Sequence, residues 1–485
     1  MINKIRVRFA PSPTGSMHIG GLRTALYNYL FAKKNHGAFI LRIEDTDQKR
    51  TVPGALEEII TILNAYGLAY DEGPILVGNN LEEKGNHGPY VQSKRLEHYK
   101  KATKELLEQG SAYRCFCTTE RLNALRQSQE KQNLPPGYDG FCRNLPNAEI
   151  ERNIKAGMNF VVRFMMPREG KTEIIDLIRG QVSFNHIVLE DAVLQKSDGF
   201  PTYHLANVVD DHLMEISHVI RGEEWLPSLP LHFLIYKTFN WQPPEFAHLP
   251  LMLSPTHKKL SKRDGDTAAK DYLKEYLPNA ILNFIALLGW NPKNNREFYL
   301  TPDEMIEDFE INKINKAGAI FEVKKLNFLN HEHLKQYPIG DLAKKIDLKL
   351  DSSELKKYLP MALERAEKNS DIPKLISFLI TDDIAYKPEL LIPKDAEANI
   401  TKTNLINIKN YLTELGPEEW LSALKIKEKT IKWIKLNGKS NQEMLWPLRV
   451  ALSGLEKSPD VFDIAYALGK GKTLSRIDNA INSLK

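Results

Sequence analysis

The first 95 residues alternate short apolar runs with longer amphipathic ones. KIRVRFA, at residues 4–10, has the character of a short strand, and LRTALYNYLFAKKNHG, at residues 22–37, has helical periodicity and ends at a glycine. The same order repeats with AFILRIEDTD at residues 38–47 and VPGALEEIITILNAYGL at residues 52–68. This βαβα order predicts a parallel, doubly wound sheet, in which ligands bind beyond the carboxyl ends of the strands.

The pattern changes further along the chain. Between Tyr113 and Pro201, short runs such as NFVVRFMMP, QVSFNHIVLE and AVLQKS indicate an inserted domain rich in β structure. The sheet pattern resumes at residues 200–225, and from about Pro255 the apolar positions recur with a helical period. We therefore expect an α/β fold with a doubly wound parallel-sheet (Rossmann-type) domain, an inserted α+β domain and an all-helical C-terminal half.

Composition narrows the class of protein. The chain has 485 residues, 42% hydrophobic and 26% charged, which is typical of a globular protein with several domains. A formal net charge of +4 does not by itself indicate a nucleic-acid partner. Three cysteines exclude a disulfide framework and favour a reducing compartment, so we expect a cytoplasmic protein. The sequence contains no signal-peptide pattern and no run of ~20 apolar residues, so we expect no membrane association.

Two segments have the composition of phosphate-binding elements. RFAPSPTGSMHIGG, residues 8–21, places small residues, His18 and two glycines between a strand and a helix, where backbone N–H groups favour an anion. HKKLSKRDGD, residues 257–266, gathers Lys and Arg before a flexible turn. Each also has an ordinary interpretation, as a connecting turn or a solvated loop. Together they predict a nucleotide site in which lysines neutralise the charge of a departing pyrophosphate.

A third segment, RIEDTD at residues 42–47, places acids directly after an apolar strand. Clustered acids at such a position are often a solvated loop. At the carboxyl edge of a parallel sheet they also have the chemistry to hold an amine, a ribose or Mg²⁺. The sequence leaves these interpretations open.

With the segments at residues 8–21 and 257–266 taken together, the chain resembles the class I aminoacyl-tRNA synthetases of the glutamyl and glutaminyl type. PSPTGSMHIGG resembles their HIGH signature, with Gly21 in place of the second histidine, and KLSKR resembles their KMSKS loop. RIEDTDQKR, GPYVQSKR, YDG, KSDGFPTYHLANVVDDH and VIRGEEWLPS follow the order of that family. The helical C-terminal half resembles the bacterial glutamyl type, because the glutaminyl type has β-barrels there.

The resemblance implies a reaction and its site residues. Glutamate would attack the α-phosphorus of ATP, with Mg²⁺, and the resulting glutamyl-adenylate would transfer glutamate to the 3′ end of tRNA. The implied catalytic residues are His18, Lys259 and Lys262. The implied ATP-binding residues are His18, Gly20, Gly21, Glu224, Trp225, Lys259, Ser261 and Lys262. The implied glutamate-binding residues are Arg8, Ser12, Glu44, Tyr203, Asn207 and Arg221.

Arg221 matters most for the choice of amino acid. Glutamate has two carboxylates and one ammonium, so its pocket needs about two cationic groups and one acid. A pocket for neutral glutamine would leave the Arg221 cation unpaired, at a cost on the order of a few kcal/mol. Arg8 has the alternative interpretation of a strand residue that faces water. A glutaminyl enzyme and a non-catalytic tRNA-binding relative remain the alternative functions.

The cysteines resemble a zinc site found in some members of the family. Cys115, Cys117 and Cys142 correspond to three thiolate ligands, and Asn144 stands where histidine is usual. Tyr138 occupies a position that donates a phenolate in a related enzyme. The alternative is a set of buried thiols without a metal.

The resemblance also predicts the domain boundaries and the partners. The expected domains are a catalytic domain at 1–95 and 202–254, an acceptor-stem domain at 96–201, a helical stem-contact domain at 255–338 and anticodon-binding domains at 339–395 and 396–485. The expected partners are ATP, L-glutamate and glutamate tRNA, bound by a monomer, with Arg365 near the last anticodon base. GNNLEEKGNHG, residues 78–88, is charged and rich in Gly and Asn, and we expect an exposed loop there.

Overall fold

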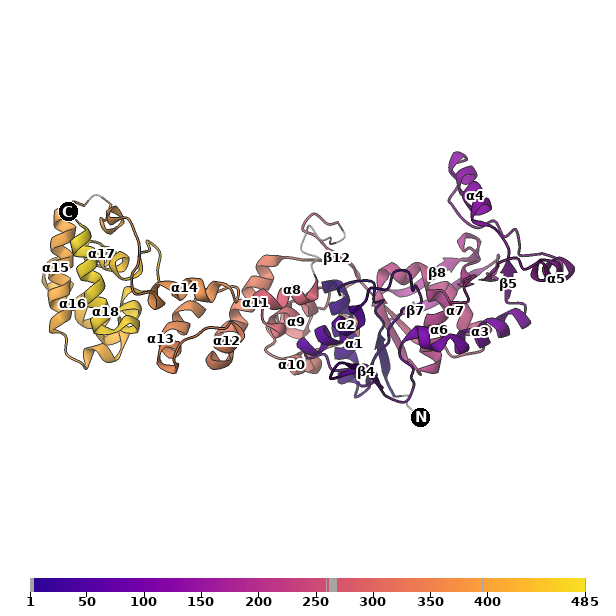
Figure 1. Cartoon of the computed structure of the whole chain (residues 1–485), viewed down its shortest axis with the longest axis horizontal. Helices are drawn as coiled ribbons and strands as arrows, with labels where there is room; N and C mark the ends of the chain where they lie inside the picture. Colours follow the sequence, from indigo (N-terminus) through magenta and orange to yellow (C-terminus); the bar gives the residue numbers. More distant parts are fainter. Residues whose placement is uncertain (1–3, 259, 261–267, 395, 485) are drawn as a thin grey trace. The chain divides into compact units, whose positions relative to one another are not determined.

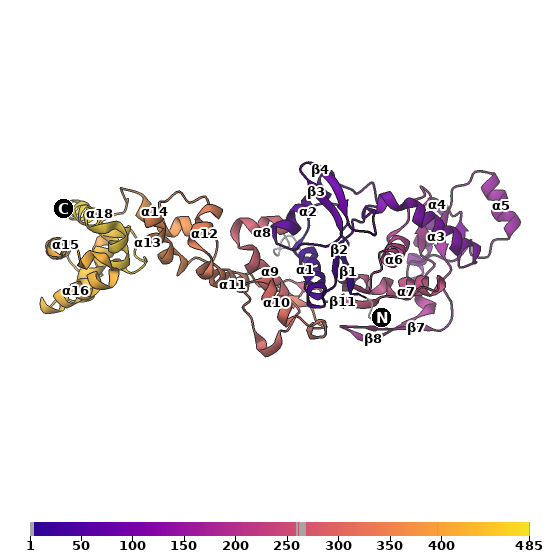
Figure 2. The same cartoon turned by 90° about the horizontal axis from the view of Figure 1, so that it is seen from below.

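The computed structural model describes residues 4–258, 260, 268–394 and 396–484. These residues form two compact units. The first unit comprises Met1–Leu273 and Pro278–Leu326, and the second comprises Lys274–Leu277 and Asn327–Lys485. Figures 1 and 2 show the first unit in indigo to pink and the helices of the second in orange to yellow. Each unit is described by itself below.

The first βαβ segment forms as the sequence predicts. Strand β1 (Arg6–Phe9) leads through the PSPTG turn into α1 (Ile19–Lys34), and β2 (Ala38–Leu41) returns parallel to β1. Every residue of both strands is buried, as expected for parallel strands that are covered on both faces. Helix α2 (Ala55–Ala65) follows, and its apolar residues Ile59, Ile60, Ile62 and Leu63 are buried.

A second sheet of the domain that is predicted to be catalytic comes from residues about 200 positions later. Strand β10 (His218–Gly222) pairs in parallel with β11 (Glu245–Leu249), and α6 (Tyr203–Leu213) and α7 (Leu229–Thr238) flank this pair in sequence. The backbone N–H of Ser217 donates to the carbonyl of Arg6 at 2.9 Å, so β10 starts beside β1. The carboxyl ends of β1 and β10 therefore lie at one edge.

The segment between these halves forms a small antiparallel sheet with helices around it. Strand β6 (Val161–Phe164) lies between β5 (Ala112–Cys115) and β9 (Val193–Gln195). Figure 1 shows α4 and α5 extending from this region. The bounds of the helices that belong here are Leu96–Glu108 for α3, Thr119–Lys131 for α4 and Asn147–Lys155 for α5.

A hairpin from the same segment joins the catalytic sheet instead. Strands β7 (Lys171–Asp176) and β8 (Gly180–Asn185) pair antiparallel, and Asp176 at the end of β7 lies opposite Phe246 of β11. This hairpin brings the Asp176 carboxylate to the strand that ends at the predicted site.

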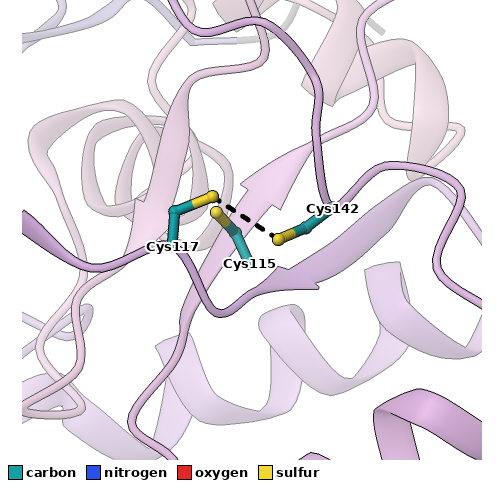
Figure 3. Close-up of side chains that lie close together, drawn as sticks. All are labelled: Cys115, Cys117 and Cys142. Carbon is teal, nitrogen blue, oxygen red and sulfur yellow. Dashed lines mark hydrogen bonds between the residues drawn. The ribbon is translucent and has the colours of Figure 1, made fainter. Parts of the chain in front are cut away.

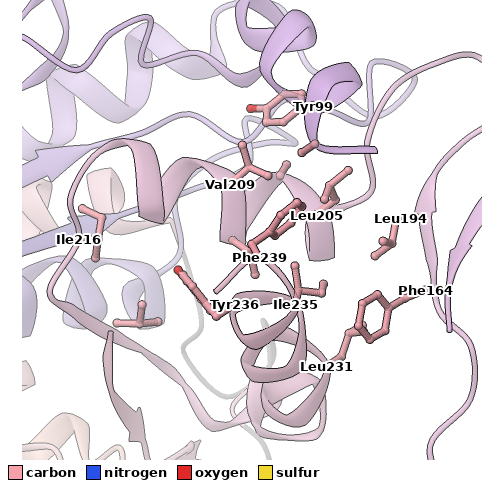
Figure 4. Close-up of a cluster of buried hydrophobic side chains, with 14 of the residues drawn as sticks. Tyr99, Phe164, Leu194, Leu205, Val209, Ile216, Leu231, Ile235, Tyr236 and Phe239 are labelled. Carbon is pink, nitrogen blue, oxygen red and sulfur yellow. The ribbon is translucent and has the colours of Figure 1, made fainter. Parts of the chain in front are cut away.

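One hydrophobic cluster connects the sheet to the inserted strands (Figure 4). Leu205 and Val209 of α6 pack with Ile235 of α7, and Phe164 and Leu194 join them from β6 and β9. Since these side chains are almost completely buried, the insertion shares a core with the catalytic sheet.

Residues 78–88 were expected to form a loop, but the structure has a strand within them. Strand β4 (Asn80–Lys84) pairs with β3 (Gly73–Val77) around a two-residue turn that begins at Gly78, which has a φ of 62°. Glycine takes this conformation without steric cost, and a two-residue turn of this kind closes a hairpin. The segment is exposed, as expected, but its first half is a strand.

The remainder of the chain is mainly helical. The helices are α8 (Ala269–Glu275), α9 (Pro278–Leu287), α10 (Pro302–Asp308), α11 (Val323–Gln336), α12 (Ile339–Lys345), α13 (Ser352–Leu363), α14 (Asp371–Ile380), α15 (Ala398–Glu414), α16 (Ala423–Leu436), α17 (Asn441–Ser453) and α18 (Val461–Ser483). Capping boxes start α13 at Asp351 and α17 at Ser440. None of the helices among the described residues is both long and apolar enough to cross a membrane.

The α/β fold class with a helical C-terminal half is confirmed, with one small exception. Strand β13 (Ala319–Ile320) pairs in parallel with β12 (Met252–Leu253), because the backbone N–H groups of Ala319 and Phe321 donate to the carbonyls of Leu251 and Leu253. A two-residue strand is too short to leave an alternating pattern in the sequence.

The shared core makes a stability prediction. We expect Leu205→Ala to lower the free energy of unfolding of the first unit by about 2–5 kcal/mol, because the fully buried side chain leaves a cavity. Denaturant titration monitored by circular dichroism measures this change. Leu213→Ala on the same helix is the control, because that side chain is 38% exposed. Equal losses in both variants would contradict the assigned core.

Candidate active site

A cavity of about 260 Å³ lies where β1, α1 and β10 meet. It brings together residues that the sequence analysis selected from three distant segments. The predicted site residues that line it are Arg8, Ser12, Gly20, Gly21, Glu44, Tyr203, Arg221, Glu224 and Trp225. Phe9, Ala10, Thr24, Ile220 and Gly222 complete its wall. His18 and Asn207 are not part of the lining, and each has a different position described below.

The start of α1 has the geometry of an anion site. His18 is the N-cap residue, with extended backbone angles, and the first turn contains no acidic residue. Gly20 and Gly21 occupy that turn, where backbone N–H groups have no partner within the helix. A Cβ at Gly21 would lie 3.3 Å from Cγ of Met17, so a larger residue would crowd the turn.

Leu260 within the Lys-rich segment, and Ala268 and Ala269 after it, lie next to the start of α1. Ala268 forms an antiparallel bridge with His18, and the N–H of Ala269 donates to the carbonyl of Met17 at 2.8 Å. Leu260 lines a small cavity of about 100 Å³ together with Gly20.

The predicted residues Lys259, Ser261 and Lys262 lie outside the described residues. Their roles therefore stay predictions.

A buried network of charges lies behind Arg8. Asp211 on α6 accepts from Arg8 Nε at 3.0 Å and from Arg42 Nη1 at 2.6 Å, and Arg42 Nη2 donates to Glu44 at 3.0 Å. Asn207 Oδ1 accepts from both guanidinium groups, at 3.1 Å from Arg8 and 3.2 Å from Arg42. Asn207 therefore supports Arg8 from behind, and two cations and two carboxylates balance each other.

The surroundings shift the pKa values of the two acids in opposite directions. Burial favours the neutral form of Asp211, but the nearby guanidinium groups of Arg42 and Arg8 outweigh it and hold the pKa of Asp211 below its ordinary value. For Glu44 burial is stronger than the attraction of the same two arginines, and the pKa of Glu44 is raised. Of the two acids, Glu44 is the one that lines the cavity.

Arg221 has a different environment from Arg8. Its side chain is buried, and Nε donates to His248 Nε2 at 3.0 Å. Nη1 lies 3.0 Å from the hydroxyl of Tyr203 and 3.1 Å from Nδ1 of His232, and Nη2 makes a longer contact of 3.4 Å with the carbonyl of Trp225. No carboxylate among the described residues forms an ion pair with Arg221, so the site holds a buried cation in neutral surroundings.

The acids of the RIEDTD segment have separate positions. Asp45 accepts from the backbone N–H of Ser93 at 2.8 Å and from the side chain of Gln48, so it holds the local turn. Glu44 alone of the acids in this segment lines the cavity. The interpretation of a ligand-binding acid therefore applies to Glu44.

The three cysteines lie together in the inserted region (Figure 3). The Sγ atoms of Cys115, Cys117 and Cys142 all lie within 4.8 Å of one another. The hydroxyl of Tyr138 is 3.4 Å from Sγ of Cys115 and 3.8 Å from that of Cys117, whereas Asn144 is exposed. Hydrogen bonds from Cys142 and then Tyr138 lower the pKa of Cys115 to about 4, despite its burial. This donor set offers up to four soft or anionic ligands.

A larger cavity of about 740 Å³ adjoins the first one. Tyr203 and Trp225 line both cavities, and Arg126, Arg163 and His204 contribute to the larger one.

Arg365, the predicted tRNA contact, lies in the helical unit, where its guanidinium donates to the carbonyl of Ser458 at 2.8 Å.

Sequence reasoning missed the residues that surround the two pocket arginines. Arg42 stands two residues before Glu44, directly after β2, and its alternation with Glu44 was a usable signal. Asp176, His232 and His248 gave no signal, because they belong to three segments that only the fold brings together.

The buried charge network makes a prediction. We expect Asp211→Asn to lower the free energy of unfolding of the first unit by about 3–5 kcal/mol at pH 7, because Glu44 alone would then balance two buried guanidinium groups. Since the pKa of Asp211 lies below its ordinary value, the difference is full above pH ~4 and shrinks as the pH falls further.

Denaturant titration at several pH values measures this difference. Asp139→Asn serves as the control, because Asp139 forms a half-exposed pair with Arg121 and such a pair contributes about 1 kcal/mol or less. A loss no larger than that of the control would show that the buried network is not a stabilising unit.

Comparison with known proteins agrees with this geometry. Residues 4–328 match the catalytic domain of the class I tRNA synthetases (E and Q), and residues 330–481 match an anticodon-binding domain. A glutamate–tRNA ligase of Alkaliphilus metalliredigens is 42% identical over 98% of each chain, and one of Clostridium tetani is 43% identical over 100% of this chain and 98% of its own.

A solved structure extends the match to three dimensions. The crystal structure of a glutamate tRNA ligase from Elizabethkingia meningosepticum, in complex with its amino acid, has a TM-score of 0.90, with 38% identity and full coverage of both chains. On the cavity, its charged residues and these matches, the chain belongs to the class I tRNA synthetases, among the glutamate–tRNA ligases.

Proposed function

We propose that this chain attaches L-glutamate to the 3′ end of glutamate tRNA in an ATP-dependent reaction. The observation that carries the proposal is the buried Arg221 guanidinium, which has neutral partners and no carboxylate among the described residues. The glutamate–tRNA ligases that match over nearly the full chain support it.

The charges of the pocket suit glutamate. Arg8 and Arg42 form ion pairs with Asp211 and Glu44, whereas Arg221 forms none with a carboxylate of the described residues. The side-chain carboxylate of glutamate would supply that missing partner, whereas glutamine would leave the buried cation unpaired. The side-chain carboxylate would accept from Arg221 and Tyr203.

The backbone end of glutamate has its own set of residues. The α-ammonium would donate to Glu44 and Ser12, which both line the cavity. Arg8 would orient a carboxylate, because Asp211 and Asn207 hold its guanidinium in place. This fixed orientation matters, because attack requires the α-carboxylate to meet the phosphorus in line.

ATP would bind beside the start of α1. Backbone N–H groups near Gly20 and Gly21 and the His18 side chain would contact the phosphates, and Trp225 and Glu224 would border the nucleoside. The α-carboxylate oxygen of glutamate attacks the α-phosphorus, and pyrophosphate leaves as glutamyl-adenylate forms. We propose that Lys259 and Lys262 stabilise the charge of the leaving group, and that Mg²⁺ accompanies the phosphates.

The second step needs the end of the tRNA next to the adenylate. We propose that the terminal nucleotide enters the 740 Å³ cavity, which shares Tyr203 and Trp225 with the amino-acid pocket. Its ribose hydroxyl attacks the glutamyl carbonyl, and AMP leaves. The anticodon-type domain at residues 330–481 would bind the far end of the same tRNA, with Arg365 as one candidate contact. A monomer in the cytoplasm remains our expectation.

An aminoacylation assay tests the proposed function. We expect the purified protein to charge glutamate tRNA with glutamate and to discriminate against glutamine. Arg221→Gln should raise the KM for glutamate about 100-fold, because a charge-assisted pair is lost, and should reduce the preference for glutamate over glutamine.

Arg121→Gln is the matched control, since that arginine pairs with exposed Asp139 and neither residue lines the cavity. Faster charging of glutamine than of glutamate by the parent protein would refute the proposal. An unchanged KM in Arg221→Gln would refute the assigned role of Arg221.

The cysteine cluster fits a structural zinc ion. The three Sγ atoms lie within 4.8 Å of one another, and the phenol hydroxyl of Tyr138 lies beside two of them. This set matches the four ligands of tetrahedral zinc. We propose that Cys115, Cys117, Cys142 and Tyr138 hold zinc, which would tie β5 to the segment that carries α4.

Metal analysis tests this site. We expect about one equivalent of zinc in the purified protein and its loss in Cys142→Ser, together with a lower melting temperature, because the ion crosslinks separate segments. Asn144→Ala is the control and should retain the metal, because Asn144 is exposed. A metal-free parent protein with an unchanged Cys142→Ser variant would contradict the zinc site.

A further inference from the structure

The guanidinium of Arg221 contacts neutral side chains from three other elements, β11, α6 and α7. Its partner His248 occupies the paired position on the neighbouring strand, since Arg221 and His248 are opposite each other in the parallel register of β10 and β11. Paired residues of adjacent strands point to the same face, so the pairing itself delivers the imidazole to the guanidinium. Both side chains are buried.

The Asp176 carboxylate determines which nitrogen of His248 faces Arg221. It lies 2.7 Å from Nδ1 of His248 and also accepts from the backbone N–H groups of Ile178 and Arg179 at 3.0 and 2.9 Å. A carboxylate held in this way accepts a hydrogen bond from Nδ1–H, so the proton stays on Nδ1 and the lone pair on Nε2 is free to accept from Arg221 Nε.

A second pair of side chains, His232 of α7 and His204 of α6, repeats this arrangement with two imidazoles. His232 Nδ1 lies 3.1 Å from Arg221 Nη1, and its Nε2 lies 3.1 Å from Nδ1 of His204. When Nδ1 of His232 accepts from Arg221, Nε2 carries the proton and donates to His204. His232 is completely buried, and His204 lines the larger cavity.

Both pairs need neutral imidazoles, and burial provides them. Burial, with a further effect of Arg221, lowers the pKa of His204 and that of His248 to about 4, and the pKa of His232 also lies well below its ordinary value. An imidazolium has no lone pair to accept from the guanidinium, so the protonated form would repel Arg221.

We propose that the Asp176–His248 and His204–His232 pairs are positioning residues that orient Arg221 and reserve its charge for the side-chain carboxylate of the amino acid. Asp176 is a negative charge that one imidazole separates from Arg221. It therefore offsets part of the cost of burying the cation without occupying Nη2, whose one hydrogen bond among the described residues is the 3.4 Å contact with Trp225. The inference rests on the proposed function and names the source of its selectivity.

Steady-state kinetics of three variants test the proposal. His248→Leu should raise the KM for glutamate about 10- to 100-fold and lower the preference for glutamate over glutamine by a similar factor, because Arg221 loses an oriented acceptor. The KM for ATP should stay within about twofold. His248→Gln should restore the KM for glutamate to within about fivefold, because the amide oxygen accepts from Arg221 while the amide nitrogen donates to Asp176.

His218→Leu is the matched control, because His218 lies at the other end of β10 and contacts Ser217 and Glu245 instead of Arg221. If His248→Leu does not fold, His232→Leu carries the same test from α7.

A parental KM for glutamate in a folded Leu variant would overturn the inference, and so would a His248→Gln variant as impaired as His248→Leu. Both outcomes leave the proposed function intact, provided that the parent enzyme charges glutamate. A parent enzyme that prefers glutamine overturns the proposed function and this inference with it.

Discussion

The site depends on the burial of a guanidinium that forms no ion pair with a carboxylate in the part of the chain that the structure describes. Removing an unpaired cation from water carries a large penalty, and proteins normally place an acid against such a group. Arg221 has instead the hydroxyl of Tyr203 and two imidazoles as its partners. These dipoles orient the cation but do not cancel its charge. Burial of the Arg221 cation therefore carries a free-energy cost. On the proposed function, an amino acid with a side-chain carboxylate would relieve this cost, and an amino acid with an uncharged side chain would not.

The parallel sheet makes this arrangement possible. Arg8 lies on β1 and Arg221 on β10, and the contact between Arg6 and Ser217 places these strands side by side although about 200 residues separate them. Asp211 and Asn207 reach Arg8 from α6, which precedes β10 directly. The inserted residues between the two halves return the β7–β8 hairpin to the same sheet, where Asp176 meets His248. The surroundings of the two arginines thus come from elements within the insertion and on both sides of it.

The sequence predicted the elements better than the contacts. The βαβα order and the helical C-terminal half were accessible, because periodicity carries that information in short windows. Nine of the residues that line the cavity were implied by the resemblance of short motifs to a known family. The β3–β4 hairpin was missed, since a charged, Gly-rich segment has the composition of a loop and its pairing depends on a turn at Gly78. The partners of Arg221 were missed for a different reason. Asp176, His232 and His248 are isolated polar residues within apolar surroundings, and only the strand register and the α7 packing assign them to one group.

The two arginines of the pocket show why residue type alone does not define a binding role. Arg8 and Arg221 are both buried and both line the cavity, yet Asp211 already neutralises Arg8. A ligand carboxylate that meets Arg8 gains orientation and little net charge compensation, because that charge is matched within the protein. On the proposed function, a ligand carboxylate that meets Arg221 would supply an ionic partner that the described residues do not provide. We therefore propose that discrimination between a charged and an uncharged amino acid arises at Arg221, and that Arg8 contributes the geometry in which the reaction occurs.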